Sequence, residues 1–214
     1  MTLSAFDLTC HRGGTRLFDP VQFDLPPGTA RLLRGPNGVG KTTLLRAIAG
    51  LGAGAEGTVT LDGAPLADQE GVVAYTGHLD AVKPALTVVE NLGFWVALSG
   101  VGAVEEALQA FNLTGLRDRV AGRLSAGQKR RLGLARLSLS GARVWLLDEP
   151  TVSLDQDSTA ALGGIISAHL EKGGYALIAT HLPIPIEAAP LPLTPAKPEV
   201  AHAAADPFLA DGFT

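Results

Sequence analysis

The chain has 214 residues, of which 46% are hydrophobic, a formal net charge of −4 and one cysteine, Cys10. This length fits one sizeable domain with an ample core, the acidic balance argues against a nucleic-acid-binding surface, and a single cysteine excludes an internal disulfide and suits a reducing compartment. The first residues lack the basic and apolar regions of a signal peptide. The uncharged residues 91–104 are too few to span a bilayer, which takes about 18 apolar residues, so we expect any membrane role to come through a partner.

Residues 1–78 start with strand-rich sequence that is broken by turn signals such as Asp62-Gly63. A strand-like segment, residues 29–34, leads directly into a glycine-rich loop, and the largely apolar residues 44–49 then start a helix. The loop fits the pattern G-x-x-x-x-G-K-[ST], whose function requires this order of strand, loop and helix. Its residues are Gly35, Pro36, Asn37, Gly38, Val39, Gly40, Lys41, Thr42 and Thr43.

This loop has the chemistry of a phosphate-binding site. Its glycines allow successive backbone N–H groups to converge on phosphate oxygens, and the helix N-terminus adds partial positive charge at the same place. Lys41 would neutralise the β- and γ-phosphates, and the Thr42 hydroxyl would be a Mg²⁺ ligand. The alternative is a glycine-rich turn that matches by chance, but the flanking strand and helix argue against it. The sequence therefore predicts binding of a nucleoside triphosphate with Mg²⁺.

Residues 79–135 have a mainly helical pattern, with helices expected over residues 88–98 and 104–111 and after Ser125. Ser125 is a good N-cap, and the start of its helix is an anion site. Three cations follow, from Lys129 to Arg131. We interpret them as a solvated helix face in preference to a nucleic-acid-binding surface.

Residues 136–182 return to alternating helix and strand, and two apolar strands end in polar side chains. The strand over residues 144–147 delivers Asp148 and Glu149 at its carboxyl end, where α/β sheets bind their ligands. Asp148 would hold Mg²⁺, mostly through water, and Glu149 is placed to polarise an attacking water as general base. Two acids alone could mark an exposed strand end, but together with the phosphate loop they indicate a nucleotide hydrolase. His181 follows the second strand.

The segment Leu124-Ser125-Ala126-Gly127-Gln128 resembles Leu-Ser-Gly-Gly-Gln, the signature of ABC transporter ATP-binding subunits, and Ala126 departs from it by one methyl group. The resemblance implies an ATP-dependent homodimer that closes head-to-tail. In such a dimer Ser125, Gly127 and Gln128 would face the nucleotide held by the opposite subunit, and Gly127 must allow close backbone approach.

The same resemblance implies an α/β fold, with a P-loop NTPase core of ABC type over residues 1–78 and 136–182 and an inserted helical subdomain over residues 79–135. Asp155 fits the family's loop that crosses the dimer interface. His181 matches the switch histidine, which in this family contacts the γ-phosphate and the catalytic glutamate, here Glu149.

Two positions depart from the broad family. His78 stands where a glutamine normally lies beside the Mg²⁺, and an imidazole can contact water or phosphate but not as an amide would. Cys10, His11, Arg12 and Gly13 stand where an aromatic residue normally stacks on adenine. An imidazole or a guanidinium could stack there instead.

These departures narrow the resemblance to one family among the ABC transporter ATP-binding subunits. Tyr75-Thr76-Gly77-His78, the Leu-Ser-Ala-Gly-Gln signature and Ala179-Thr180-His181-Leu182-Pro183 are together similar to the CcmA family, the ATPase subunits of the cytochrome c maturation system, over residues 3–187. This implies a subunit that hydrolyses ATP with Mg²⁺ at the cytoplasmic face of the bacterial inner membrane. Its partners would be an integral, CcmB-like membrane subunit and other cytochrome c maturation proteins, and it would energise heme delivery or release of a heme-loaded chaperone.

Other functions stay open at this point. An ATPase subunit for another exported substrate would share every catalytic residue. A soluble ABC ATPase acting on DNA or ribosomes is disfavoured by the single unit and the acidic charge, and a non-hydrolysing regulator is disfavoured by Glu149 and His181. In transporters the groove between the subdomains receives a short helix from the membrane subunit. Phe94 and Trp95 could line this groove, but we favour core packing for the pair.

Residues 183–214 differ in composition from the rest of the chain. They contain seven prolines, a density that opposes regular helix or central strand. We therefore predict a lightly ordered tail, rich in proline and alanine.

Overall fold

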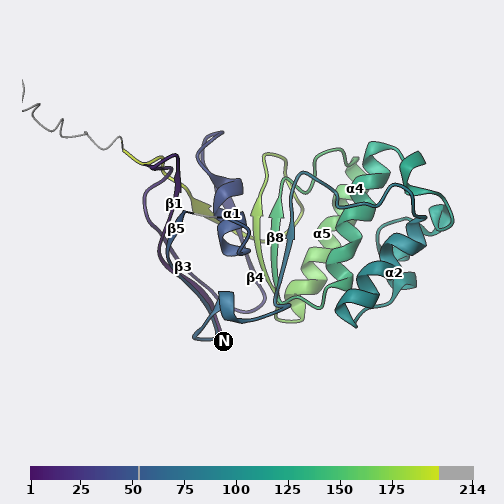
Figure 1. Cartoon of the computed structure of the whole chain (residues 1–214), viewed down its shortest axis with the longest axis horizontal. Helices are drawn as coiled ribbons and strands as arrows, with labels where there is room; N and C mark the ends of the chain where they lie inside the picture. The colour runs from purple at the N-terminus through teal and green to yellow at the C-terminus, as the bar shows by residue number, and fades with distance from the viewer. Residues whose placement is uncertain (53, 198–214) are drawn as a thin grey trace, which may run out of the picture.

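The computed structural model describes residues 1–52 and 54–197, which form two sheets and a group of helices (Figure 1). The first sheet is antiparallel, as the strand-rich beginning of the chain and its turn signals indicate. β3 shows the expected alternation of buried and exposed side chains, so one face of this sheet packs on the core. Its strands are β1 (Leu3–Arg12), β2 (Thr15–Arg16), β3 (Val21–Leu25), β5 (Ala55–Leu61) and β6 (Ala64–Pro65).

The second sheet is parallel, with strand order β10-β4-β9-β8-β7. The central strands β8 and β9 are buried along their whole length, as expected for strands that are covered on both faces. The carboxyl ends of β4, β8 and β9 lead into the phosphate loop, Glu149 and Thr180, so these segments meet at one edge of the sheet. The strands are β4 (Thr29–Arg34), β7 (Val73–Thr76), β8 (Val144–Asp148), β9 (Tyr175–Ala179) and β10 (Ala189–Pro192).

Helices cover the two faces of the parallel sheet. α1 (Lys41–Ile48) lies between the two sheets, and α5 (Gln156–Glu171) lies on the opposite face (Figure 1). Because side chains alternate along a strand, β8 contributes to two separate cores. Leu146 packs in the cluster with α1 and the antiparallel sheet, whereas Leu147 packs in the cluster with α5 and the remaining helices.

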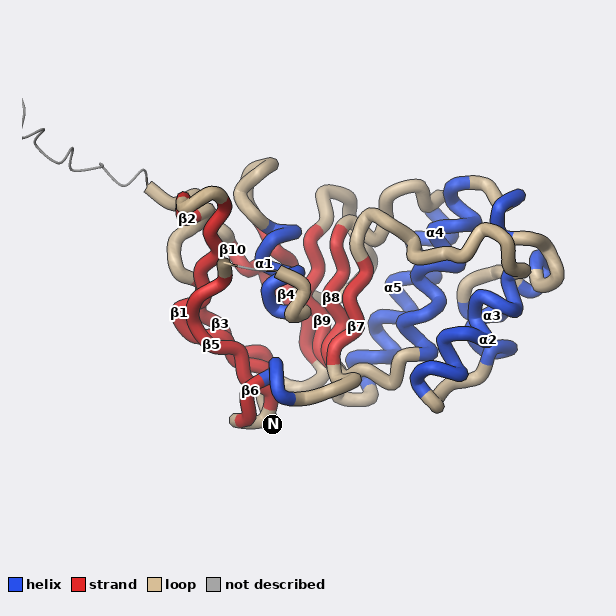
Figure 2. Tube along the Cα trace, in the orientation of Figure 1, coloured by secondary structure: helices blue, strands red, loops and turns tan. Residues whose placement is uncertain are grey.

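The remaining helices gather at one end of the molecule, away from the antiparallel sheet (Figure 2). α2 begins with a capping box between Thr87 and Glu90 and ends at Gly100, which has a φ of 71°. The helices are α2 (Val88–Ser99), α3 (Val104–Ala110) and α4 (Ala126–Ala135), and the 3₁₀ turns are η1 (Leu66–Asp68), η2 (Thr114–Leu116), η3 (Ala121–Arg123) and η4 (Arg136–Leu139).

The aromatic pair on α2 divides between core and surface. Trp95 packs against the core of the helical region, whereas Phe94 is 41% exposed. The two rings meet edge to face with centroids 5.4 Å apart, and the Lys83 ammonium lies 4.2 Å from the centre of the Phe94 ring. Core packing, predicted for both residues, therefore describes Trp95 and not Phe94.

The prediction of a lightly ordered tail is wrong for residues 183–197. β10 pairs in parallel with β4 at the edge of the sheet, and Leu191 and Leu193 are buried. The two prolines of β10, Pro190 and Pro192, are two residues apart, so both lack their N–H on the side that faces away from β4, an arrangement that an edge strand tolerates. Residues 198–214, the rest of the predicted tail, lie outside the described residues.

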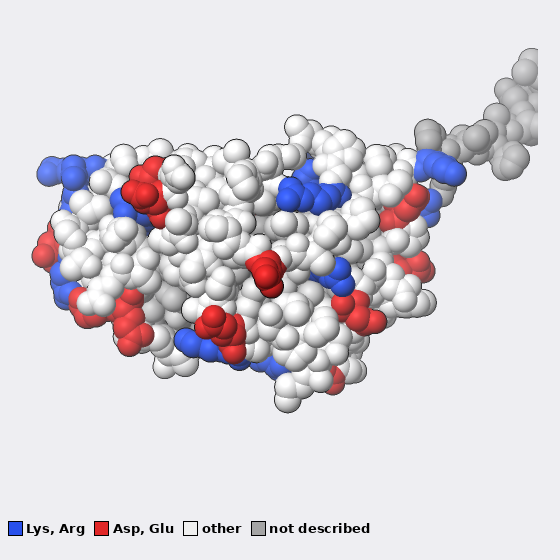
Figure 3. Space-filling model, turned by 180° about the vertical axis from the view of Figure 1, so that it is seen from behind, with Lys and Arg blue, Asp and Glu red and all other residues white. Residues whose placement is uncertain are grey.

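Within the described residues, no helix combines the length and the apolar character needed to cross a membrane. Figure 3 shows one face of the molecule, on which basic and acidic side chains are interspersed among uncharged ones. The electrostatic potential of this face therefore has no single dominant sign.

Candidate active site

The phosphate loop connects β4 to α1 at the carboxyl edge of the parallel sheet. Gly40, the last residue before α1, has a φ of 111°, a left-handed value that favours glycine. A Cβ at this position would also lie 3.0 Å from the Phe18 ring. Val39 is buried and anchors the loop in the core, whereas Pro36, Asn37 and Gly38 are exposed.

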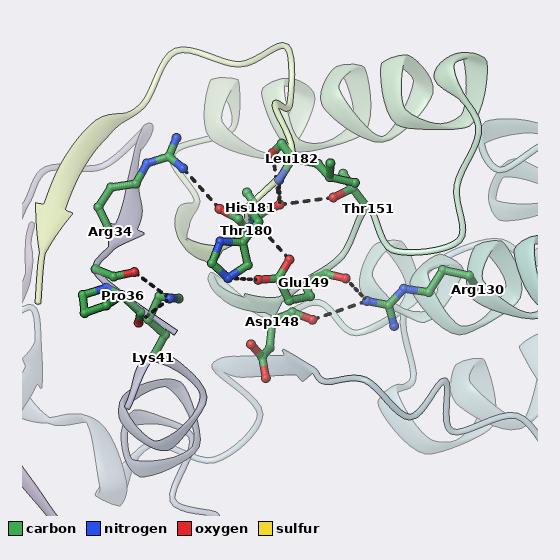
Figure 4. Close-up of polar contacts among 11 residues, drawn as sticks. Arg34, Pro36, Lys41, Arg130, Asp148, Glu149, Thr151, Thr180, His181 and Leu182 are labelled. Atoms are coloured by element: carbon green, nitrogen blue, oxygen red, sulfur yellow. Dashed lines mark hydrogen bonds and ion pairs between the residues drawn. The ribbon is translucent and has the colours of Figure 1, made fainter. Parts of the chain in front are cut away.

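Lys41 is the first residue of α1 and is only 9% exposed. Its ammonium group donates to the carbonyl oxygens of Gly35 at 2.9 Å and Pro36 at 3.2 Å, so the loop curves around it (Figure 4). Thr42 and Thr43 lie in the first turn of the same helix, where backbone N–H groups have no intrahelical partner. A cation, free N–H groups and a helix N-terminus together form a site for an anion.

The buried strand β8 ends at Asp148, which is 5% exposed. The Asp148 Oδ2 atom lies 3.5 Å from the Tyr75 hydroxyl. Burial, and then the nearby Asp148 charge, raise the pKa of the Tyr75 hydroxyl. The phenol therefore keeps its proton and can donate to this carboxylate.

Glu149 follows Asp148 with a φ of 48°. A non-glycine residue in this left-handed region costs about 1 kcal/mol or more, so the surrounding contacts must hold it there. Its N–H donates to the carbonyl oxygen of Ala179 at 2.7 Å. This bond fixes the residue against the end of β9.

His181 lies directly against Glu149, and both were predicted to belong to the site. The His181 backbone N–H donates to Glu149 Oε2 at 3.2 Å, and its Nε2 atom lies 3.4 Å from Glu149 Oε1 (Figure 4). The imidazole is 54% exposed and the glutamate side chain 26%. Both groups are therefore anchored through backbone contacts while their polar ends remain accessible.

Thr180, immediately before His181, is held from two sides. Its hydroxyl lies 3.1 Å from that of Thr151, and its carbonyl oxygen accepts a hydrogen bond from Arg34 at 3.2 Å (Figure 4). Arg34 is the last residue of β4, directly before the phosphate loop. The His181 segment is thus tied both to the loop after Glu149 and to the phosphate loop.

His78 lies near the same acidic end. It lines a cavity of about 300 Å³ together with Asp80, Arg130 and Glu149. It also lines a second cavity, of about 350 Å³, with Tyr75 and Arg136. His78 therefore lies between the cavity that contains Glu149 and a second cavity that is lined by α1, β7 and Arg136.

The signature residues form the start of α4. Ser125 is its N-cap: the Ser125 hydroxyl accepts from the Gln128 N–H at 3.3 Å, and the Gln128 side chain accepts from the Ser125 N–H at 2.9 Å. This is a capping box, so Gln128 has a structural task within its own chain. A Cβ at Gly127 would lie 2.7 Å from the Ser153 carbonyl oxygen, so close approach already requires glycine here.

Asp155 is the N-cap of α5, and its carboxylate accepts from the Ser158 N–H at 2.8 Å. Hydrogen bonds from Ser158 hold the pKa of this carboxyl below its usual range. Residues 149–155 thus form a loop between β8 and α5 that packs on the signature helix through Ser153.

Arg130 is a residue whose importance the sequence interpretation missed. The prediction of a solvated face over Lys129–Arg131 is wrong for Arg130, which is 5% exposed and donates to the Pro150, Glu149 and Gly77 carbonyl groups. The helical period could have revealed it, because Leu134 and Leu137 follow Arg130 at i+4 and i+7, on its own face. Both leucines are buried.

The segment expected near adenine is divided by burial. Cys10 is 1% exposed in β1, and burial raises the pKa of its thiol to about 11, so it packs as an apolar residue. The His11 ring lies 3.9 Å from the Glu56 carboxylate, and Arg12 is exposed. Of the four candidate residues, His11 has an imidazole ring and Arg12 a guanidinium group, and either could stack on the adenine of a bound nucleotide.

Comparison with known proteins also indicates an ATP-binding protein of the ABC transporter type. The profile of the ABC transporter family matches residues 18–152. The chain is 51% identical over 195 residues to the cytochrome c biogenesis ATP-binding export protein CcmA of Ruegeria pomeroyi, with 91% of this chain and 92% of that protein covered. It is 54% identical over 180 residues to the protein of the same name from Paracoccus denitrificans, covering 84% and 82%.

Solved structures agree. An ABC transporter ATP-binding protein from Pyrococcus furiosus superposes with a TM-score of 0.81 at 25% identity, covering 90% of this chain and 98% of that one. The ADP conformation of MJ1267, an ATP-binding cassette of an ABC transporter, superposes with a TM-score of 0.71 at 25% identity, covering 86% and 83%. The predicted α/β fold with a P-loop core of ABC type is confirmed, and so is ATP hydrolysis as the activity. The chain belongs to the ABC transporter family of ATP-binding proteins and, within it, to the CcmA family.

Proposed function

We propose that this chain hydrolyses MgATP to drive a membrane complex of c-type cytochrome biogenesis. The observation that carries the proposal is its 51% identity, over 91% of its length, to a protein named for cytochrome c biogenesis and export. The complex would contain an integral, CcmB-like membrane subunit and other cytochrome c maturation proteins, with this chain bound peripherally at the cytoplasmic face of the inner membrane. ATP use would serve heme delivery or release of a heme-loaded chaperone.

The phosphate loop would bind the nucleotide. Lys41 moves from the Gly35 and Pro36 carbonyls to neutralise the β- and γ-phosphates, and N–H groups of residues 35–43 donate to the phosphate oxygens. The donor set for a metal is one hydroxyl, Thr42, and one buried carboxylate, Asp148. This set fits Mg²⁺, which takes one or two carboxylates and completes its shell with water and substrate phosphate. Bound Mg²⁺ would neutralise charge that develops on the phosphates.

Glu149 would act as general base. Its carboxylate takes a proton from a water whose oxygen forms a bond to the γ-phosphorus while the bond to the bridging oxygen of ADP breaks. His181, 3.4 Å from the Glu149 carboxylate, would orient that water and contact the γ-phosphate. His78 shares a cavity with Glu149 and would report the state of the γ-phosphate to the membrane subunit.

Two copies would close head-to-tail around two nucleotides. Ser125 and Gly127 of one copy would then meet the phosphates bound by the other, with Gln128 holding the start of α4 in shape through its capping box. Asp155, in the loop that packs on α4, would lie at the same interface. Closure would move the membrane subunit, and hydrolysis would reset it.

The decisive experiment is performed in cells whose only copy of this ATPase carries Lys41→Ala. Because this change removes the cation that binds the phosphates, we expect loss of covalent c-type cytochromes, read by heme staining of denatured membrane proteins, while b-type cytochromes remain. Lys172→Ala, at an exposed position after α5, is the matched control and should retain c-type cytochromes.

The alternative function is an ATPase subunit of an exporter for another substrate, since it would use the same catalytic residues. Normal c-type cytochromes in the Lys41→Ala cells, with the purified variant shown to lack ATPase activity, would favour this alternative. A membrane subunit that no longer assembles in the variant would instead mean that the loss is indirect.

A further inference from the structure

The Arg130 side chain is buried and forms hydrogen bonds with several segments of the chain. All three nitrogens of its buried guanidinium donate: Nε to Pro150 O at 3.2 Å, Nη1 to Gly77 O at 2.8 Å and Asp80 Oδ1 at 3.0 Å, and Nη2 to Glu149 O at 2.7 Å and Asp148 O at 3.4 Å. A buried charge is stable only when it is paired and its hydrogen bonds are satisfied. Arg130 meets both conditions, through Asp80 and four carbonyl groups.

These partners belong to two separate loops. One is the turn after β8, where Glu149 has its left-handed backbone, and Arg130 holds its carbonyl oxygen directly (Figure 4). The other is the segment after β7, where Gly77 and Asp80 flank His78. One guanidinium therefore sets the distance between the segment that carries Glu149 and the segment that carries His78.

Arg130 itself belongs to a third element, the signature helix α4, which begins at the N-cap Ser125. This helix lies flush on both loops. A Cβ at Gly133 would fall 2.6 Å from the Asp80 carbonyl oxygen, and a Cβ at Gly127 would fall 2.7 Å from that of Ser153. Close backbone contact at both glycines leaves α4 little freedom to slide without moving the loops.

We propose that Arg130 is a positioning residue for ATP hydrolysis, which holds the Glu149 turn and the His78 segment in one arrangement and couples both to the signature helix. This inference rests on the proposed roles of Glu149, His78 and Ser125. The three nitrogens of its guanidinium are engaged by Asp80 and backbone carbonyl groups, so Arg130 acts through the segments that it holds. It acts because the planar fork of a guanidinium reaches several carbonyl groups at fixed angles, which an ammonium cannot do.

The test compares Arg130→Met and Arg130→Lys in steady-state hydrolysis and in equilibrium binding of ATP to the isolated chain. Because misplacing a catalytic group by about 1 Å can cost about 100-fold in rate, we expect kcat of Arg130→Met to fall about 100-fold. ATP affinity should be unchanged, since the phosphate loop shares no hydrogen bond with Arg130. Arg130→Lys keeps the charge and some of the bonds, so its kcat should lie about tenfold above that of the methionine variant.

Arg131→Met is the matched control. It is the next residue of α4, but its guanidinium donates to Phe111 O and Asn112 O within the helical region, so its kcat should stay near that of the wild type. Thermal unfolding shows which variants fold. If Arg130→Met does not fold, a reduced kcat of Arg130→Lys at unchanged ATP affinity still supports the proposal.

The proposal is overturned if Arg130→Lys has a wild-type kcat and Arg130→Met either has one too or does not fold. It is also overturned if kcat falls only as far as ATP affinity falls. An equal loss of kcat in the control Arg131→Met would overturn it as well. Glu149→Gln is measured alongside. If that variant still turns over, the proposed role of Glu149 has failed, whatever the Arg130 variants do.

Discussion

Lys41 is held by carbonyl groups five and six residues away along the chain, whereas Glu149 is held by partners 19 and 32 residues away. The phosphate end of the site is thus a piece of local structure, a loop with its strand and its helix. The Glu149 end is assembled from the turn after β8, the turn after β9 and the signature helix. Its geometry depends on how these elements are packed against one another.

The difference separates binding from turnover. A local loop keeps its shape when distant elements shift, so nucleotide affinity should depend mainly on residues 35–43. A composite of long-range contacts changes when any one element moves, so turnover should depend on residues that never meet the nucleotide. Substitutions at the two ends should therefore have different kinetic signatures.

The largest effect is expected at the local end. Lys41→Ala removes the cation of the phosphate loop, and loss of a partner from a close charge pair costs roughly 2 to 5 kcal/mol, which corresponds to ATP binding that is about 30-fold to about 5,000-fold weaker. Titration calorimetry with MgATP measures this directly. An ATP affinity within a fewfold of the wild type would show that the loop binds phosphate without its lysine. It would contradict the view that nucleotide affinity depends on this local end of the site.

The phosphate end also has long-range support from Leu193, directly after β10. Leu193 is 3% exposed, its N–H donates to Arg34 O at 2.6 Å, and its own carbonyl oxygen would meet a Cβ on Gly35 at 2.7 Å. Leu193→Ala should lower the free energy of unfolding by about 3 kcal/mol and weaken ATP binding along with it. Urea unfolding and calorimetry provide the two readouts.

Leu98→Ala is the control for Leu193→Ala, because Leu98 is 68% exposed and its loss should stay within about 0.5 kcal/mol. If Leu193→Ala destabilises the chain but leaves ATP affinity intact, the phosphate loop is more independent of the C-terminal strand than these contacts suggest.

Gly133→Ala tests the Glu149 end without removing any polar group. The new methyl group would meet the Asp80 backbone at 2.6 Å, and overpacking of this kind costs about 1 to 3 kcal/mol. Because Asp80 and the neighbouring His78 must move, we expect kcat to fall more than ATP affinity. Gly164→Ala on α5 has nothing within 4 Å of its Cβ, and should instead stabilise the chain by roughly 0.5 to 1 kcal/mol. Equal effects of the two substitutions would contradict the packing argument.

The smallest effect is expected at the opposite ends of the strands, where His169 stacks on Trp145 with ring centroids 3.8 Å apart. Burial lowers the pKa of His169 below its ordinary value of 6.5. As the pH falls through 6.5, His169 gains a proton in the unfolded chain more readily than in the folded chain. The contribution of neutral His169 to the free energy of unfolding is therefore complete above that pH and is lost as the pH falls toward 5. The loss of stability should be small, because the ring is only half-buried and solvent screens its charge.

His169→Phe keeps a stacked ring that does not titrate, so it should flatten the pH dependence of unfolding between pH 7 and pH 5. Chemical denaturation at several pH values measures this slope. The same slope in variant and wild type would exclude His169 as its source. Turnover at neutral pH should not change, because this ring belongs to neither end of the nucleotide site.

The division between local and long-range structure also explains what the sequence could predict. The phosphate loop, the acidic end of β8 and the strand before His181 are continuous patterns, and each was recognised with its flanking elements. Burial of Arg130 was missed because three consecutive cations average to a polar helix, while only one of them lies on the buried face. β10 was missed because proline density argues against strands in general, whereas an edge strand needs only every second N–H.

The central claim is that ATP binds at the local end and is hydrolysed at the assembled end. Glu149→Gln tests it most directly, because the amide keeps the shape of the side chain and loses its basicity. A positioned base contributes about 100-fold or more to the rate, so phosphate release should fall at least that far while MgATP still binds and a dimer accumulates in light scattering. Phosphate release near the wild-type rate, in a variant that binds MgATP normally, would contradict the account.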